Sequence, residues 1–175
     1  MIERTEATDT ANRLVGRFLQ HFSLVEAALD KAITTLTGLN WSVAAALTAN
    51  TPFVKKVDFL FLTEAEVSEK ADHERKRFLR DTRSAILRIN DNRVIAAHCG
   101  FDHNQVGSII FRRVTANQTL KISDVIWTEA NVEEMCAIAC ELVKTIETII
   151  DQMVPFKHKL DFSDSRNSGY ATLLF

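Results

Sequence analysis

The feature that most constrains the fold is an amphipathic pattern over residues 13–37. This pattern of apolar residues, at alternating spacings of three and four positions, follows one narrow stripe of an α-helix. Gly38 is a residue type that commonly ends a helix, and a narrow stripe is buried by a second helix at a shallow crossing angle. A long helix in a bundle is therefore predicted, with its partner in the same chain or in a second copy. The stripe consists of Val15, Phe18, Phe22, Val25, Leu29, Ala32 and Leu36.

Two shorter segments and one longer segment follow with helical character. Residues 42–50 are rich in alanine. Thr51-Pro52 is typical of an N-cap followed by proline at the first helical position, so we expect a helix from there to about residue 67. Ser68 can cap the next helix, which is polar at first and apolar towards Ile89.

After Gly100 the pattern changes to that of strands. Residues 108–115 and 120–127 alternate between apolar and polar around a polar Ala-Asn-Gln turn, which predicts a β-hairpin. Asn131 with Glu134 resembles a capping box that opens a last long helix, which we expect to end at proline 155. The apolar stripe of that helix is Val132, Met135, Ile138, Leu142, Ile146, Ile149 and Met153.

These elements predict a mainly α protein: a four-to-five-helix up-and-down bundle with a β-hairpin inserted before the last long helix. The length of 175 residues suits one domain, in which 108–127 form the insertion and 156–175 a tail. The tail is polar and then abruptly apolar from Tyr170 to Phe175. We expect its end to dock on the core of the chain or on a neighbouring molecule.

Composition argues against a membrane or secreted protein. No apolar run approaches the ~20 residues of a membrane helix, and the first residues lack the basic-then-apolar pattern of a secretion signal. The net charge of −2 favours neither nucleic acid nor membrane as a partner. Cys99, Cys136 and Cys140 are odd in number and lack the C-x-x-C spacing. We expect them to be reduced core residues of a cytoplasmic protein.

Several enzyme classes lack their motifs in this chain. There is no phosphate-binding or dinucleotide-binding glycine loop and no G-x-S-x-G elbow. His98 and His103 flank Asp102, but the spacing matches no standard zinc pattern. We therefore expect no metal site and no cofactor.

The segment 74–93 is locally basic. Seven cations stand there against three carboxylates, an excess of plus four, and Arg112, Arg113 and Lys121 of the hairpin can extend this surface. Clustered cations neutralise phosphates and release counterions, which gives affinity for nucleic acid; a solvated helix face is the alternative. The cations are Arg75, Lys76, Arg77, Arg80, Arg83, Arg88 and Arg93, and the carboxylates are Glu74, Asp81 and Asp91.

Arg93 and His98 pose a geometric problem. Residues five apart on a regular α-helix point about 140° away from each other, so on a straight helix these two cannot serve one small site. A break in the helix or a second copy of the protein could bring them together. Asn90, Asp91 and Asn92 are all N-cap residue types, so we expect a break and a fresh helical start before Arg93.

The spacing Arg93-Val-Ile-Ala-Ala-His98 resembles the R-x4-H signature of the HEPN superfamily. The segments FSLVE at 22–26 and NDNRVIAAHCGF at 90–101 are similar to the surroundings of that motif in many members, the latter to a frequent RNxIAHGxF. The resemblance covers roughly residues 13–100 and 131–154. Active members usually carry a polar residue directly after the arginine, whereas this chain has Val94; Asp91 or Asn92 could substitute from the other side.

The resemblance implies a helical, homodimeric protein with the two motifs near the dimer interface. Many members are metal-independent endoribonucleases of toxin–antitoxin, phage-defence or RNA-processing systems, and others are inactive binding modules. Arg93 would hold the scissile phosphate, since arginine offers a permanent bidentate charge. His98 would move protons, since histidine can give or take one near neutral pH. Glu26, on the first helix, could reach and orient Arg93, or could be a surface carboxylate.

The sequence thus predicts a HEPN-like protein acting on RNA, an endoribonuclease of a bacterial toxin or defence system. One motif histidine per chain, His98, is a thin supply for two proton transfers, and a dimer that apposes two copies of His98 would remedy that. The expected partners are a second copy, RNA, and an antitoxin or other protein. Two alternatives stay open: a catalytically inactive HEPN-like dimer that binds protein or nucleic acid, and a helical module without any link to RNA.

Overall fold

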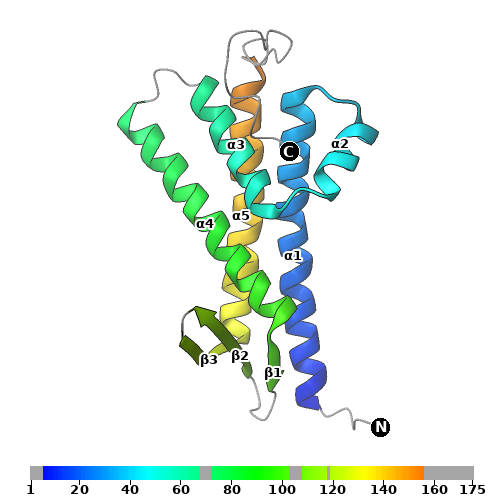
Figure 1. Cartoon of the computed structure of the whole chain (residues 1–175), viewed down its shortest axis with the longest axis vertical. Helices are drawn as coiled ribbons and strands as arrows, with labels where there is room; N and C mark the ends of the chain where they lie inside the picture. The colour runs from blue at the N-terminus through cyan, green and yellow to red at the C-terminus, as the bar shows by residue number, and fades with distance from the viewer. Residues whose placement is uncertain (1–5, 68–71, 103–107, 118, 156–175) are drawn as a thin grey trace.

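The computed structural model describes residues 6–67, 72–102, 108–117 and 119–155. Successive helices of the described chain run in alternating directions along the long axis of the molecule, with the short α2 inclined to it (Figure 1). The strands form a small antiparallel sheet that precedes α5. The predicted mainly α fold, with a hairpin inserted before the last long helix, is confirmed. The elements are α1 (Glu6–Thr37), α2 (Trp41–Ala49), α3 (Phe53–Val67), α4 (His73–His98), β1 (Gly100–Asp102), β2 (Ser108–Asn117), β3 (Thr119–Thr128) and α5 (Glu129–Met153).

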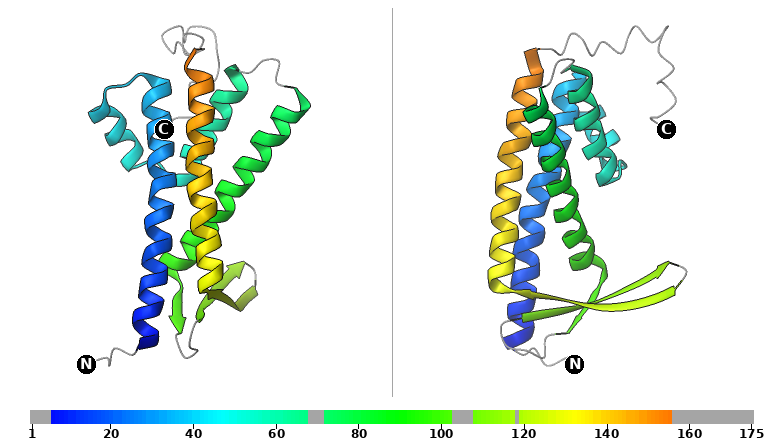
Figure 2. Two further views of the ribbon diagram at one scale, coloured as in Figure 1. Left: turned by 180° about the vertical axis from the view of Figure 1, so that it is seen from behind. Right: turned by 90° about the vertical axis from the view of Figure 1, so that its left-hand side faces the viewer.

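The partner of the first apolar stripe is α5 of the same chain. Helices α1 and α5 run side by side in the same direction in both views of Figure 2. In each of their three ion pairs the residue numbers differ by 116, so the two helices are parallel and in constant register. Exposed pairs of this kind contribute little stability, but they record the register. Arg13 pairs with Glu129 at 3.0 Å, Arg17 with Glu133 at 3.6 Å and Lys31 with Glu147 at 2.8 Å.

Both predicted apolar stripes lie in the core, with one exception. In α1 the stripe residues are buried apart from the half-buried Val15, and Gly38, with φ 68°, follows the last helical residue. In α5 the exception is Ile138, which is 41% exposed. Small residues, Cys136 and Ala139, are buried against the neighbouring helices in its place, so the stripe of α5 is rotated slightly from the predicted one.

The helix starts differ from the sequence prediction at three places. Pro52 precedes the first helical residue of α3, and its carbonyl accepts from the backbone N–H of Lys56 at 3.2 Å. The N-cap of α4 is Asp72, whose carboxylate accepts from the Arg75 backbone; the predicted cap, Ser68, is outside the described residues. The capping box of α5 joins Thr128 to Asn131, three residues before the predicted box, which was therefore wrong.

The sheet confirms the hairpin and adds one strand that the sequence did not predict. Strand β1 pairs with β2 in antiparallel register, with Gly100 opposite Arg112. One face of the hairpin base is buried against the helices, where Trp127 lies 5.1 Å from the Phe18 ring and 4.6 Å from the Phe111 ring. The rest of the hairpin projects sideways from the end of the bundle (Figure 2).

Only one of the three cysteines is a core residue. Cys136 is buried, Cys99 is half-buried and Cys140 is exposed, so the prediction that all three fill the core was wrong. Burial raises the pKa of the Cys136 thiol. Cys140 lies one helical turn away on the solvent side of α5.

This difference predicts selective alkylation. Because a thiol reacts as its thiolate, Cys136 should stay unmodified by iodoacetamide at pH 8 while Cys140 reacts. The alkylation rate of Cys136 should begin to rise at a higher pH than that of a free thiol, because the pKa of Cys136 is raised. Peptide mass spectrometry of the native protein measures both sites, and equal modification of the two would contradict the packing of α5.

Candidate functional site

One unbroken helix carries both Arg93 and His98. Helix α4 continues through Asn90, Asp91 and Asn92 to His98, so the predicted break was wrong. Buried apolar residues lie on both sides of this polar cluster, among them Ile89 and Ile95. Their burial is available only if the helix continues, and it outweighs the local preference of asparagine and aspartate for a helix start.

Arg93 faces the first helix. Its guanidinium carbon lies 6.0 Å from the ring centroid of Phe22 in α1, and its side chain is half-buried. Phe22 itself is buried and packs on Phe53 of α3. A guanidinium over an aromatic face is a favourable cation–π contact, so this arginine contributes to the packing of α4 on α1.

His98 faces elsewhere. It is the last residue of α4 and is exposed, as is Val94 one turn earlier. Within the described chain its side chain has no hydrogen bond or ion pair. On a continuous helix it points about 140° from Arg93. The structure therefore does not bring the two motif residues together within one chain.

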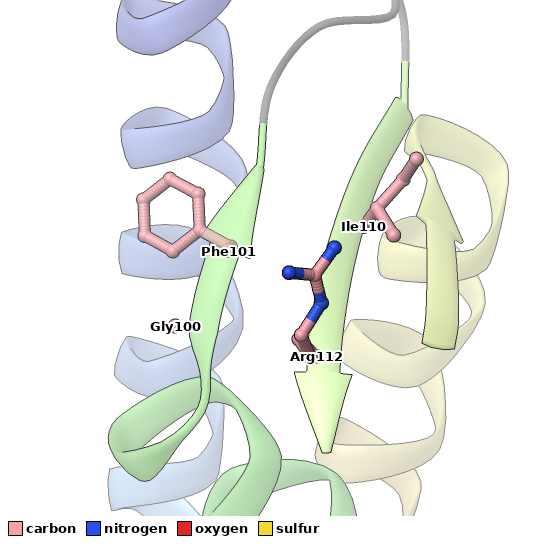
Figure 3. A pocket seen from close by; sticks show the side chains of 4 residues that line it. All are labelled: Gly100, Phe101, Ile110 and Arg112. Atoms are coloured by element: carbon pink, nitrogen blue, oxygen red, sulfur yellow. The ribbon is translucent and has the colours of Figure 1, made fainter. Parts of the chain in front are cut away.

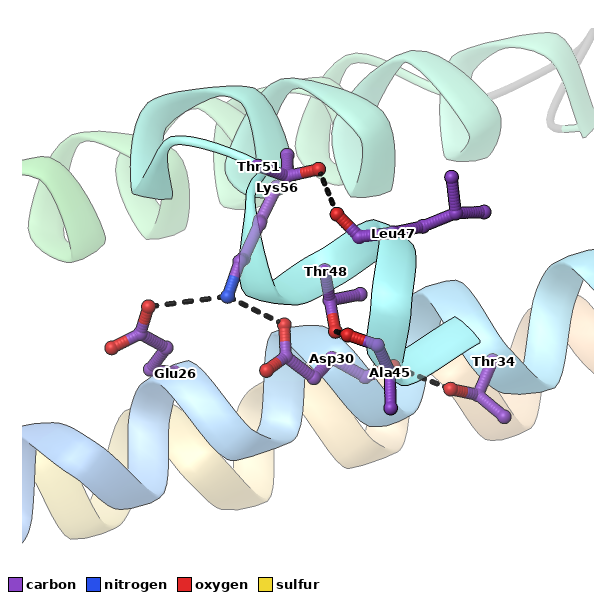
Figure 4. Close-up of polar contacts among 8 residues, drawn as sticks. All are labelled: Glu26, Asp30, Thr34, Ala45, Leu47, Thr48, Thr51 and Lys56. Carbon is purple, nitrogen blue, oxygen red and sulfur yellow. Dashed lines mark hydrogen bonds and ion pairs between the residues drawn. The ribbon is translucent and has the colours of Figure 1, made fainter. Parts of the chain in front are cut away.

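In the described part of the chain, none of the proposed supporting residues forms a hydrogen bond or ion pair with Arg93. Glu26 was considered either as a partner that orients Arg93 or as a surface carboxylate; its carboxylate pairs with Lys56 of α3 at 3.1 Å (Figure 4). Asp91 is exposed and Asn92 is half-buried, and both lie within the continuous helix α4 and not at a helix start. The interpretation of Glu26 as a partner of Arg93 was therefore wrong.

Lys56 is a buried cation that sequence reasoning missed. Its side chain is 4% exposed and lies between Glu26, at 3.1 Å, and Asp30, at 2.8 Å (Figure 4). Oδ1 of Asp30 is buried from solvent, and its ion-pair partner is the ammonium of Lys56. The sequence signal was the pair of carboxylates four residues apart on α1, which share one helix face.

The basic side of α4 is partly neutralised by α3. Arg75 donates to Glu64 at 3.0 Å, where the carboxylate side chain is 1% exposed, and Arg83 donates to Asp58 at 2.7 Å. The exposed surface of α4 keeps four cations against three carboxylates, an excess of plus one instead of plus four. These cations are Lys76, Arg77, Arg80 and Arg88, and the carboxylates are Glu74, Asp81 and Asp91.

The hairpin carries a second group of cations, with Arg112 on one face and Arg113 and Lys121 on the other. Arg112, Arg113 and Lys121 are exposed there, with Asp124 as the one carboxylate between residues 108 and 127. Arg112 reaches Asp124 only loosely, at 3.9 Å. The hairpin therefore carries an excess of plus two on a projecting arm, the shape with which β-ribbons enter nucleic-acid grooves.

Arg112 also lines an open pocket close to the end of α4. The pocket has a volume of about 310 Å³, and its lining residues are Gly100, Phe101, Ile110 and Arg112 (Figure 3). Because Gly100 is opposite Arg112 in the sheet, this arginine lies across from a residue two positions after His98. The pairing of β1 with β2 places Arg112 near the end of α4. Because the sequence did not predict β1, it could not indicate this position of Arg112.

The predicted absence of a metal site involves a residue that the structure does not describe, since His103 lies outside the described residues.

Comparison with protein-family models, with curated proteins and with solved structures finds no match. The geometry of the site itself is therefore the basis for any functional proposal.

Proposed function

We propose that this protein is a HEPN-like homodimer that acts on RNA, as a metal-independent endoribonuclease of a bacterial toxin or defence system. The observation that carries the proposal is the exposed His98 at the end of α4, beside the basic hairpin. A histidine without an internal partner is available for proton transfer, and nearby guanidinium groups can bind phosphate oxygens.

The chemistry requires a second protomer. Cleavage of RNA by its own 2′-hydroxyl needs one group to accept a proton, one to donate a proton, and positive charge on the phosphate. Arg93 and His98 of one chain point apart, so Arg93 of one protomer would act with His98 of the other. His98 would take the proton from the 2′-hydroxyl and return it to the 5′-oxygen leaving group as the P–O bond breaks. Arg112, which is opposite Gly100 in the sheet, would add positive charge near the end of α4 that carries His98.

The test is cleavage of RNA by the purified protein in EDTA, with a 2′,3′-cyclic phosphate as the product end. His98→Ala should lower the rate by at least about 100-fold, the usual contribution of proton transfer, and should leave the melting temperature nearly unchanged because the side chain is exposed. His73→Ala is the matched control, since His73 is an exposed histidine at the other end of α4.

Two results would contradict the nuclease proposal. One is wild-type protein that leaves RNA intact in EDTA. The other is a His98→Ala variant that cleaves as fast as the wild type, because catalysis would then come from another group or from a contaminant.

The alternative is a HEPN-like dimer that binds RNA without cutting it. It is favoured by Arg93, whose guanidinium is engaged with Phe22, and by the exposed Val94 in place of the polar residue of active members. RNA affinity should then fall steeply with salt, and Arg112→Ala with Arg113→Ala should weaken binding and reduce the salt slope. Affinity that ignores salt would exclude both RNA proposals.

A further inference from the structure

Helix α2 is apolar on all sides but buried on only one. Its sequence, WSVAAALTA, contains no charged residue, and only Ala44 and Thr48 are buried. Trp41 is 77% exposed, Leu47 50% and Val43 49%. A helix that is apolar all round is normally buried by other parts of a protein or by a membrane. No described helix has the length and apolarity needed to span a bilayer.

The uncharged surface extends beyond α2 in both directions. Residues 38–54 contain no aspartate, glutamate, lysine, arginine or histidine. Leu39 and Val54, on either side of the helix, are 37% and 42% exposed. We call the exposed side chains of Leu39, Trp41, Val43, Leu47 and Val54 the α2 surface. On the helix Trp41 lies about 160° from Val43 and about 120° from Leu47, with the small exposed residues Ala46 and Ala49 between Trp41 and Val43. An exposed apolar surface of this kind marks an interaction site.

A segment of matching chemistry lies in the same chain. Residues 170–175, with the sequence YATLLF, are uncharged and mostly apolar, whereas the residues between them and α5 are mixed and polar. An uncharged segment loses little hydration when it meets an uncharged surface, and burial of its leucine, tyrosine and phenylalanine side chains is favourable.

The segment starts from the correct end of the bundle. Since α1 and α5 keep an offset of 116, Thr37 at the end of α1 lies level with Met153 at the end of α5. The two helix ends lie side by side in Figure 2, and α2 follows α1 after a short turn. The tail therefore leaves α5 at the end of the bundle where α2 begins.

The connecting chain is long enough to reach. Sixteen residues, 154–169, separate Met153 from Tyr170, and a chain of that length spans up to about 50 Å. Helix α2 lies beside α1, so its distance from α5 is about two helix spacings, or ~20 Å. The nine residues of α2 are about 14 Å long, comparable to a docked segment of six residues.

We propose that residues 170–175 dock on the α2 surface of the same molecule. The segment would lie across the exposed side of α2, with Trp41 at one edge and Val43 and Leu47 at the other, and would thus complete the burial that the described chain leaves unfinished. This inference is independent of any action on RNA.

The test uses the fluorescence of Trp41. The only other tryptophan, Trp127, is buried at 3% exposure, and Trp41→Phe in each background identifies the signal of Trp41. In the full chain Trp41 should emit at shorter wavelength and resist quenching by acrylamide. A stop after Gly169, and the full-length double variant Leu173→Asp with Leu174→Asp, should both shift its emission to longer wavelength and raise its quenching constant.

A matched control and a dilution series complete the design. Ser163→Asp with Ser165→Asp adds the same charge to the connecting chain and should leave Trp41 shielded. The shielding should also be independent of protein concentration. Equal quenching of Trp41 in the full chain and both tail variants would overturn the proposal. Shielding that is lost on dilution would also overturn it, because a second copy would then cover α2.

Discussion

Trp127→Ala should lower the free energy of unfolding by about 3–5 kcal/mol, the usual cost of removing a buried tryptophan. Trp127 is 3% exposed, and its ring contacts Phe18 of α1 edge-on at 5.1 Å and Phe111 of β2 at 4.6 Å. The contact with Phe18 joins the hairpin to α1, so alanine would both leave a cavity and loosen the arm beside His98.

Urea unfolding followed by far-UV circular dichroism measures this loss. The matched control is Ile126→Ala, at the neighbouring strand position on the opposite face, where the side chain is 56% exposed. It should cost less than about 1 kcal/mol, because it removes mainly strand propensity. Equal losses in the two variants would mean that Trp127 does not anchor the hairpin.

Lys56→Met is expected to cost about 2–4 kcal/mol, at or slightly below the usual loss for breaking a buried ion pair. Methionine keeps the packing of the aliphatic stem but removes the ammonium that lies between Glu26 and Asp30. The two carboxylates would then repel each other, and Oδ1 of Asp30 would be enclosed without its cation. The carboxylates are partly exposed, which limits the loss.

The control for Lys56 is its neighbour. Lys55 is exposed, so Lys55→Met should change stability by less than about 0.5 kcal/mol. Adding Glu26→Gln and Asp30→Asn to Lys56→Met should recover part of the lost stability, since the uncompensated charge is then removed. A Lys56→Met variant as stable as the wild type would contradict the account of this cluster.

The sequence predicts the elements whose signals are periodic. The stripes of α1 and α5 and the alternation of the hairpin are long patterns that match their structures closely. Strand β1 has only three residues, too few to show a period, and its pairing with β2 defines it. The polar cluster at Asn90 has a clear local preference, which the burial of Ile89 and Ile95 in the folded chain overrides.

The site was harder to predict because it depends on which helices touch. The divergence of Arg93 and His98 follows from helix geometry once α4 is continuous. The contact of Arg93 with Phe22, and the neutralisation of Arg75 and Arg83 by α3, exist only because α4 packs on α1 and α3. A count of charges along the sequence cannot distinguish such cations from those that face solvent.

Arg93 and His98 lie on one continuous helix and point about 140° apart, so the proposed site combines Arg93 of one protomer with His98 of the other. The direct measurement is RNA cleavage by a mixture of Arg93→Ala and His98→Ala proteins, each inactive alone, after exchange of subunits. In the proposed homodimer the mixture should regain about a quarter of the wild-type activity, because half of the dimers would be mixed and each would have one intact site of two. A mixture that stays as inactive as its components would contradict the composite site.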